Sequence, residues 1–391
     1  MTRKRIRAIA WLRASSATAA LIVGASSVCA TPVAASAAPV VPVSGIGQTV
    51  PPAPVAAEPR HMPRVPQGWV EEEIAFPSAS GTVYGTWFHP IDTGEARPAA
   101  LLIAGSGPTD RNGNSAVPGF RTLGSLQAVA RIYAAQGVPS LRYDKLGSGK
   151  TGMGTVGQRP PTLEMFRDQS ERAFVELSRR PGVDQGRLIA VGHSEGGLFA
   201  QLLTLGERPG VPVPRGINLL APLPERYLDV IAEQLVRQVD SALAAGQLSP
   251  EEAGDIKREL AAAVAAIRAG KPLPELKGLL AQIFNPGVAL YLQQIDRHDP
   301  AVLAGRARAG TEVLVTCSEA DIQVGCPEVH RLADGFTGLY LGPRFVALKG
   351  VNHVLKEDAS RDPRLYSADV PYSTQLKTEI TRFAARLTHQ R

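Results

Sequence analysis

The feature that most constrains this chain is a Gly-x-Ser-x-Gly pentapeptide at positions 192–196. The apolar run 187–191 before it is typical of a buried strand, and 197–203 after it is typical of the start of a helix. Between a strand and a helix, this pentapeptide indicates a nucleophile elbow. Its glycines allow a sharp turn that exposes the hydroxyl of Ser194. The sequence therefore predicts a reactive serine at the carboxyl end of a strand.

An elbow of this kind requires an acid and then a histidine, each in a loop after a later strand. The strand-like run 313–317 is followed by Glu319 and Asp321, and the run 345–348 is followed by His353. His353 would accept the proton of the attacking hydroxyl, and Asp321 would orient the imidazole. We favour Asp321 over Glu319 because Glu319 lies closer to the strand. Each residue alone could be an ordinary loop residue, so the prediction rests on their order and placement together.

Acyl transfer also needs two backbone N–H groups directed at the oxygen that becomes negative. One is expected from Glu195, the residue after the serine. The other is expected from the loop 104–108, which follows a predicted strand at 99–103. The amide of Ser106 is the favoured donor, and Gly105 is the alternative. For the side chain of Glu195 we expect packing or hydrogen bonding and no catalytic step.

With these motifs the chain resembles the α/β-hydrolase superfamily of serine hydrolases. It is most similar to secreted bacterial members that carry a Gly-Ser-Gly-Pro-x-Asp-Arg-x-Gly-Asn loop, here residues 105–114, and the resemblance spans roughly residues 69–390. The resemblance implies a doubly wound, mostly parallel sheet, a Ser-Asp-His triad, and esterase or peptidase-like hydrolysis without a cofactor. The segment 142–150 resembles a loop of this family near the site, where we expect it to shape the pocket.

Two other patterns do not support the ligands that they suggest. Residues 147–151 resemble the end of a phosphate-binding loop, but Asp144 occupies the place of its first glycine, and a carboxylate repels phosphate. Residues 110–114 resemble a calcium loop, but Arg121 occupies the place of the bidentate glutamate. No group of His, Cys and acidic residues in the sequence has the spacing of metal ligands. We therefore expect no nucleotide, metal or other cofactor.

The N-terminal sequence indicates export. A basic start precedes a mainly small and apolar segment at 17–30, and Ala-Ser-Ala at 35–37 matches a cleavage site, so residues 1–37 are predicted to be a signal peptide. Cleavage near Ala30 and lipidation of Cys29 are alternatives. The apolar segment is too short and too interrupted for a membrane span.

The charge of the chain gives no support for nucleic-acid binding. Its net charge is +6, and five basic residues precede the first acidic one, so their removal leaves +1. A nearly neutral protein lacks the positive potential that attracts nucleic acid.

The cysteines also indicate export, to an oxidising compartment outside the cytosol. Without Cys29, only Cys317 and Cys326 remain, and they flank Asp321. Outside the cytosol such a pair is expected to form a disulfide, with two free buried thiols as the alternative. We expect the bond to hold the loop of the acid in register with His353.

The rest of the sequence predicts how the chain is divided. Residues 38–66 are rich in Pro, Ala and Val and are expected to form an extended, mobile leader. The core of the fold is expected over 67–222 and 305–391. Between these parts, residues 223–304 show helical stripes and a capping box at Ser249, which predict a helical cap inserted after the sixth strand. We expect the cap to supply an acyl pocket; alternatively, its stripes only pack its helices together.

Together these features predict an exported or cell-envelope serine hydrolase, with a carboxylesterase of small or medium acyl esters as the favoured activity. A peptidase or amidase is the nearest alternative, because the same triad cleaves both kinds of bond. An acyltransferase would have the same sequence features. A non-catalytic binding protein on a hydrolase scaffold is the alternative from another class. The sequence does not indicate the oligomeric state.

Overall fold

The computed structural model describes residues 59–117, 120–157 and 159–388. One mixed sheet has the strand order β1-β2-β4-β3-β5-β6-β7-β8. The pairs β1–β2 and β2–β4 are antiparallel, and all other neighbours in the sheet are parallel. The strands are β1 (Trp69–Ser78), β2 (Gly81–Pro90), β3 (Arg97–Ile103), β4 (Ser140–Tyr143), β5 (Val183–His193), β6 (Gly216–Leu220), β7 (Glu312–Ser318) and β8 (Arg344–Leu348).

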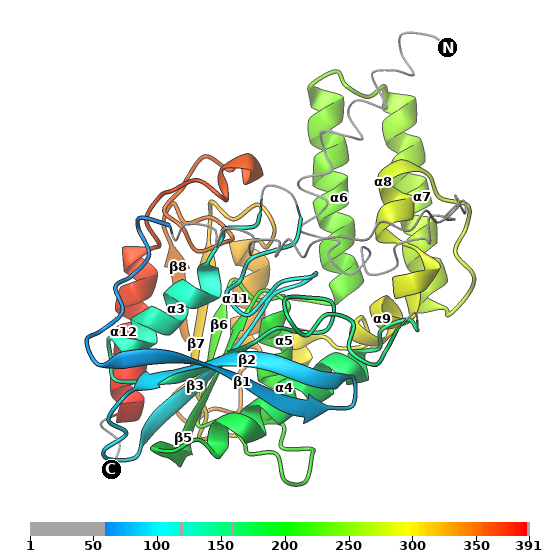
Figure 1. Ribbon diagram of the computed structural model, residues 1–391. Helices are drawn as coiled ribbons and strands as arrows, with labels where there is room; N and C mark the ends of the chain where they lie inside the picture. Colours follow the sequence, from blue (N-terminus) through cyan, green and yellow to red (C-terminus); the bar gives the residue numbers. More distant parts are fainter. Residues whose placement is uncertain (1–58, 118–119, 158, 389–391) are drawn as a thin grey trace, which may run out of the picture.

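Helices cover both faces of this sheet (Figure 1). On one face, α3 (Ser125–Ala134) and α12 (Thr374–Thr388) pack against each other. On the other face lie α4 (Leu163–Ser178), α5 (Gly196–Thr204) and α11 (Cys326–Asp334). Separate hydrophobic clusters fill the two spaces between helices and sheet. The central parallel strands are short apolar runs because they are buried on both faces. The predicted doubly wound, mostly parallel sheet is confirmed.

The order of the strands places a crevice at one end of the sheet. From β3 the chain moves to β4 on one side, and it then returns to β5 on the opposite side of β3. At such a reversal the loops after the two parallel strands separate and leave room for a ligand. The loops after β3 and β5 are those that contain the predicted oxyanion donor and the predicted nucleophile.

A helical insertion follows β6, as predicted. Its two long helices lie side by side and project away from the sheet (Figure 1). The second of them begins with the predicted capping box, in which Ser249 and Glu252 bond reciprocally to each other's backbone N–H. The helices of the insertion are α6 (Tyr227–Ala244), α7 (Pro250–Arg268), α8 (Gly278–Ile283), α9 (Pro286–Ile295) and α10 (Pro300–Ala304).

A buried carboxylate joins the helices of the insertion. Asp296, at the end of α9, is 1% exposed and accepts a hydrogen bond of 2.8 Å from the backbone N–H of Leu228 in α6. Arg226 and Arg268 contact the same carboxylate at 2.7 and 2.8 Å. Because a buried charge is stable only when it is paired and hydrogen-bonded, these contacts fix the two ends of the insertion to each other.

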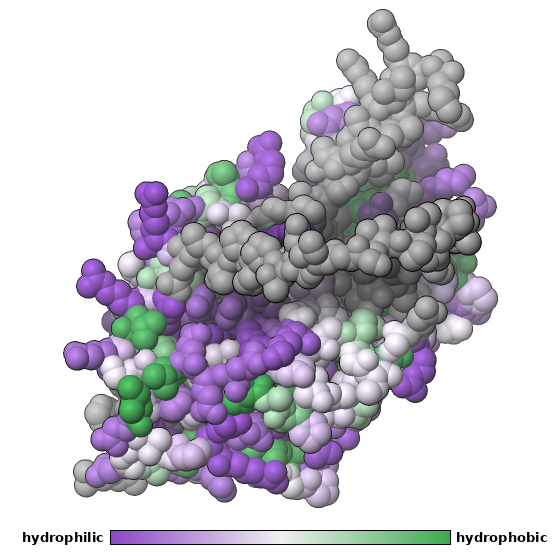
Figure 2. Space-filling model, viewed as in Figure 1, coloured by the Kyte–Doolittle hydropathy of each residue, from purple (hydrophilic) through white to green (hydrophobic). Residues whose placement is uncertain are grey.

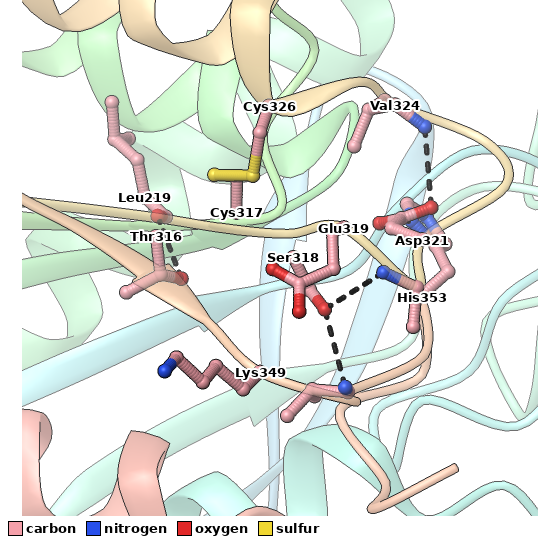
Figure 3. Close-up of a disulfide and its surroundings, with 12 residues drawn as sticks. Leu219, Thr316, Cys317, Ser318, Glu319, Asp321, Val324, Cys326, Lys349 and His353 are labelled. Carbon is pink, nitrogen blue, oxygen red and sulfur yellow. Dashed lines mark hydrogen bonds and ion pairs between the residues drawn. A yellow bond between two sulfur atoms is a disulfide. The ribbon is translucent and has the colours of Figure 1, made fainter. Parts of the chain in front are cut away.

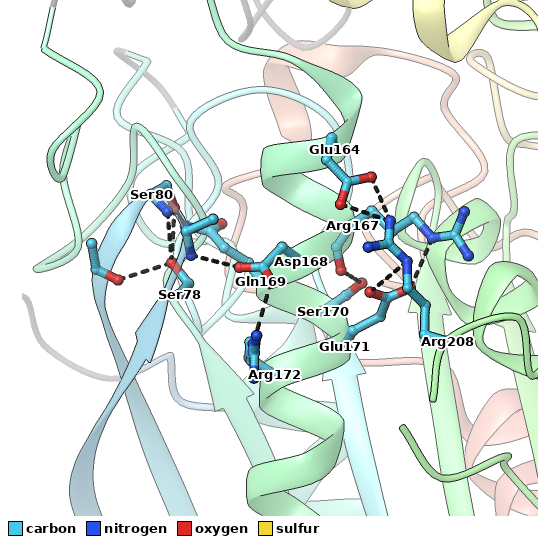
Figure 4. A network of polar contacts seen from close by, with 12 residues as sticks. Ser78, Ser80, Glu164, Arg167, Asp168, Gln169, Ser170, Glu171, Arg172 and Arg208 are labelled. Carbon is cyan, nitrogen blue, oxygen red and sulfur yellow. Dashed lines mark hydrogen bonds and ion pairs between the residues drawn. The ribbon is translucent and has the colours of Figure 1, made fainter. Parts of the chain in front are cut away.

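Helix α4 fixes two loops of the sheet through polar side chains (Figure 4). Asp168 accepts a hydrogen bond of 2.7 Å from the backbone N–H of Ala79, in the turn between β1 and β2. Gln169, which is fully buried, donates to the hydroxyl of Ser80 in that turn. Its carbonyl oxygen accepts from the backbone N–H of Leu146 at 2.8 Å. The loop after β4 is therefore held in place from α4.

The start of the described chain packs on the sheet domain. The predicted signal peptide and the leader up to residue 58 lie outside the described residues. Residues 59–66 were expected to end an extended leader with little to bury, but Met62 is buried and packs against Ala128 and Tyr372. The difference arises because the side chain of Met62 is buried between α3 and the segment before α12.

In the described part of the chain, most large apolar side chains are buried in the interior. On the face shown in Figure 2, apolar side chains over the sheet domain form small groups separated by polar ones. No helix within residues 59–117, 120–157 and 159–388 is long and apolar enough to cross a bilayer.

The predicted disulfide between Cys317 and Cys326 is present (Figure 3). It joins the end of β7 to the first residue of α11 across a sequence separation of 9. The loop between the two cysteines contains Asp321.

We expect the double variant Cys317→Ala/Cys326→Ala to lose about 2–3 kcal/mol of unfolding free energy, because the disulfide restricts the unfolded chain. Urea unfolding without reductant measures the loss. Reductant should destabilise the wild type and leave the variant unchanged. Equal stabilities of the oxidised wild type and the variant would contradict the prediction.

We expect Asp296→Asn to lower the free energy of unfolding by about 2–3 kcal/mol, because two arginines lose their buried counter-charge. Asp240→Asn is the matched control, since Asp240 pairs with Lys257 between exposed positions of α6 and α7. Such a pair contributes less than about 1 kcal/mol. Thermal or urea unfolding of both variants compares the losses, and equal losses would contradict the anchoring role of Asp296.

Candidate active site

Ser194 occupies the turn between β5 and α5 in a strained conformation. Its φ is 53°, in the left-handed region that non-glycine residues rarely adopt. Close packing holds this turn: a Cβ on Gly192 would lie 2.3 Å from the carbonyl oxygen of Gly196, and one on Gly196 would lie 2.3 Å from that of Ile103. The backbone N–H of Ser194 donates to Leu220 at the end of β6. The two glycines of the pentapeptide are therefore required by space.

Asp321 and His353 meet in the loops after β7 and β8 (Figure 3). The Nδ1 atom of His353 lies 2.7 Å from Oδ2 of Asp321, and both side chains are buried. The other carboxylate oxygen accepts hydrogen bonds from the backbone N–H groups of Gln323 and Val324 at 2.7 and 3.2 Å. The imidazole is thus held by a fixed carboxylate. Glu319, the competing acid in the sequence, is exposed.

His193 brings the histidine loop to the elbow. Its Nε2 lies 2.8 Å from the backbone carbonyl oxygen of His353, and the two ring centroids are 5.0 Å apart. Burial, followed by the nearby charge of His353, lowers the pKa of His193 to about 4. His193 is therefore neutral near pH 7, and its Nε2–H donates to that carbonyl.

The hydroxyl of Ser194 makes no hydrogen bond to another residue in the described part of the chain. Its partly exposed position leaves it facing the pocket described below. In enzymes without substrate, such contacts are often long and tighten only when the complex forms.

The loop after β3 lies directly against the elbow. A Cβ on Gly105 would be 3.1 Å from Cβ of Ser194, so a side chain here would press against the elbow. Ser106, Ser194 and Glu195 line one pocket. Within the described residues, no backbone carbonyl accepts a hydrogen bond from the N–H of Glu195. The structure thus brings together the residues predicted for the nucleophile and for the two oxyanion donors.

The rest of this pocket comes mainly from the insertion. One face of α6 contributes Tyr227, Val230, Ile231 and Gln234, which are spaced as neighbours on a helix surface. The cavity has a volume of about 30 Å³. Because one water needs at least about 10–15 Å³ on this measure, the space holds only about two waters.

A buried polar cluster beside the elbow was not foreseen in the sequence. Lys145, in the loop after β4, lies 3.3 Å from Oε1 of Glu195, and both are buried. Burial lowers the pKa of Lys145, and the charge of Glu195 opposes this shift. The buried phenols of Tyr227 in α6 and Tyr291 in α9 lie close enough to the Glu195 carboxylate to feel its charge. Burial and this negative charge raise the pKa of both phenols.

One signal in the sequence could have indicated this cluster. The segment 142–150 was expected to shape the pocket, and it contains a lysine next to the end of a strand. Lysine is rarely buried without a partner, so a lysine at this place implies a nearby acid.

The described residues contain no group of three or more His, Cys, Asp or Glu side chains placed to hold a metal ion.

Comparisons with known proteins give matches among solved structures. No protein-family model and no curated protein sequence matches the chain. An acylaminoacyl peptidase of Pyrococcus horikoshii is 13% identical with a TM-score of 0.52, over 83% of this chain and 43% of that chain. An esterase of Pyrococcus furiosus is 13% identical with a TM-score of 0.49, over 82% of this chain and 92% of that chain. Carboxyl esterase 2 of Tuber melanosporum is 14% identical with a TM-score of 0.49, over 83% of this chain and 88% of that chain.

At such low identity a structural match speaks for the fold and not for the activity. This chain spans less than half of the acylaminoacyl peptidase, whose TM-score is the highest of the three. The mostly parallel eight-stranded sheet with helices on both faces is consistent with that match. The chain therefore has the α/β-hydrolase fold.

Proposed function

We propose that this protein is an exported serine hydrolase that cleaves carboxylic esters through an acyl-enzyme intermediate. The observation that carries the proposal is the contact between His193 and the backbone of His353. His193 precedes Ser194 in the chain, so this contact ties the loop of His353, whose imidazole Asp321 orients, to the elbow of the strained, partly exposed Ser194. A nucleophile, a base and a group that orients the base are the parts that covalent acyl transfer needs.

The proposed reaction follows from these roles. The hydroxyl of Ser194 attacks the ester carbonyl while His353 takes its proton, and the N–H groups of Ser106 and Glu195 stabilise the negative oxygen. His353 then gives the proton to the leaving alcohol, which leaves an acyl group on Ser194. Water, activated by His353, releases the acid and restores the serine. Asp321 stays ionised and stabilises the imidazolium in both steps.

The helical insertion acts in this proposal as the cap that shapes the acyl pocket. Val230 and Ile231 present apolar side chains to the pocket beside Ser194. The small cavity favours short or medium acyl groups. A panel of nitrophenyl esters and aminoacyl anilides separates an esterase from a peptidase, and product analysis with added alcohol detects acyl transfer.

Export rests on two observations. The predicted signal peptide, residues 1–37, has the basic, apolar and small-residue regions of a secretory signal. The disulfide between Cys317 and Cys326 is of a kind that persists in oxidising compartments.

We expect a fluorophosphonate probe to label the wild-type protein at a single serine, identified as Ser194 by mass spectrometry, because only an activated hydroxyl attacks phosphorus. Ser194→Ala should abolish labelling and lower ester hydrolysis by about a million-fold. Ser106→Ala, which keeps the backbone N–H, is the control and should still be labelled. Equal hydrolysis by wild type and Ser194→Ala would refute the proposal.

We expect Val230→Ala to raise the kcat/KM ratio of longer to shorter acyl esters by about tenfold, because it enlarges the pocket. Val236→Ala is the matched control on the same helix, since Val236 is partly buried, packs against the core and does not line the pocket. Steady-state kinetics with acetyl, butyryl and hexanoyl nitrophenyl esters measures the ratio. The same change in both variants would count against a pocket on this face of α6.

A further inference from the structure

Lys145 is a buried lysine that the proposed reaction leaves without a role. It is 5% exposed and lies in the loop after β4, which Gln169 of α4 holds in place. Its Nζ donates to the carbonyl oxygen of Gly105 and lies 3.3 Å from Oε1 of Glu195. Burying an ammonium group costs free energy unless it is paired and hydrogen-bonded. The contacts of Lys145 with Gly105 and Glu195 therefore indicate the role of this lysine.

The carbonyl that Lys145 binds belongs to the peptide group that contains the proposed oxyanion donor, the N–H of Ser106. The C=O of Gly105 and the N–H of Ser106 are parts of the same peptide group. This group is planar and trans, so its C=O and N–H point in opposite directions. A donor that fixes the C=O of Gly105 thereby fixes the direction of the Ser106 N–H. Glycine rotates its backbone more freely than other residues, so without such a donor this peptide could turn.

The other partner of Lys145 leads to the second oxyanion donor. Glu195 follows the nucleophile, and its backbone N–H is the second donor in the proposed reaction. Its side chain, 3% exposed, turns back to Lys145. Tyr227 of α6 lines the same pocket as Glu195 and Ser106. One ion pair therefore connects the two residues that would supply the N–H groups.

We propose that Lys145 and Glu195 are positioning residues of the oxyanion hole: Lys145 locks the peptide between Gly105 and Ser106, and Glu195 holds Lys145 on its carbonyl. This inference rests on the proposed function, because it gives the Ser106 N–H a reason to be fixed. The pair touches no reacting atom. It acts on the transition state, where the oxygen is negative, and leaves binding of the uncharged ester unchanged.

The first test is Lys145→Met, which keeps the length of the side chain and removes the donor. We expect kcat for a nitrophenyl ester to fall about 100-fold while KM changes less than about threefold, because one oxyanion donor is misdirected. Affinity for a trifluoromethyl ketone, which binds as an oxyanion, should fall in parallel with kcat/KM. A loss confined to KM, or unchanged affinity for the ketone, would overturn the proposal.

Two further variants separate positioning from general damage. Lys145→Met/Glu195→Gln removes the carboxylate that Lys145→Met leaves unpaired, and we expect the same loss of kcat. Wild-type kcat in this double variant would mean that only the unpaired charge matters, and the proposal would fail. Arg131→Met is the matched control, because Arg131 is a buried cation on α3 that donates to a backbone carbonyl, that of Pro63. It should keep kcat near the wild-type value.

Amide hydrogen exchange decides the inference independently of activity. In a peptide covering residues 101–108, we expect exchange at Ser106 to be at least about tenfold faster in both Lys145 variants than in the wild type and Arg131→Met. If Ser194→Ala hydrolyses esters as the wild type does, the proposed function fails, and this measurement still shows whether Lys145 holds the peptide. Unchanged exchange at Ser106 overturns the inference even in an active enzyme.

Discussion

The left-handed backbone of Ser194 is the constraint on which the other parts of the site depend. A non-glycine residue in this region costs of order 1–3 kcal/mol and persists only where its surroundings impose it. Here the surroundings are the backbones of three neighbouring strands. Gly196 lies against the carbonyl of Ile103 at the end of β3, and the N–H of Ser194 bonds to Leu220 at the end of β6. A larger residue at Gly196 would displace the elbow and the loop of Ser106 together.

The order of the strands explains why distant loops meet at this turn. Ser194, Asp321 and His353 follow β5, β7 and β8, and all three strands run parallel, so their carboxyl ends share one edge of the sheet. β7 and β8 are neighbours, which makes the acid and histidine loops adjacent. β6 separates β5 from β7, and His193 reaches across this interval to the backbone of His353. The disulfide fixes the far end of the acid loop, at the start of α11, to β7.

Sequence patterns predicted the parts of this fold that depend on local chemistry. The buried strands are apolar runs, and the capping box at Ser249 starts α7 where expected. The short helices α8 and α10 were not predicted, because segments of 6 and 5 residues carry too little periodicity to recognise. The burial of Met62 and the pairing of Lys145 with Glu195 also escaped prediction. Each depends on a partner far along the chain: the position of Lys145 implies a nearby acid, but no local pattern identifies which one.

The chemistry of Lys145 and Glu195 indicates that the pair orients the peptide between Gly105 and Ser106 and does not serve mainly to stabilise the fold. A buried ion pair often stabilises a protein no more than apolar side chains of similar volume would. Apolar contacts, however, have no preferred direction, whereas a hydrogen bond requires its donor and acceptor to be aligned. The peptide of Gly105 could be packed tightly by a leucine and still rotate. An ammonium group on its carbonyl, held from the far side by Glu195, defines which way the opposite N–H points.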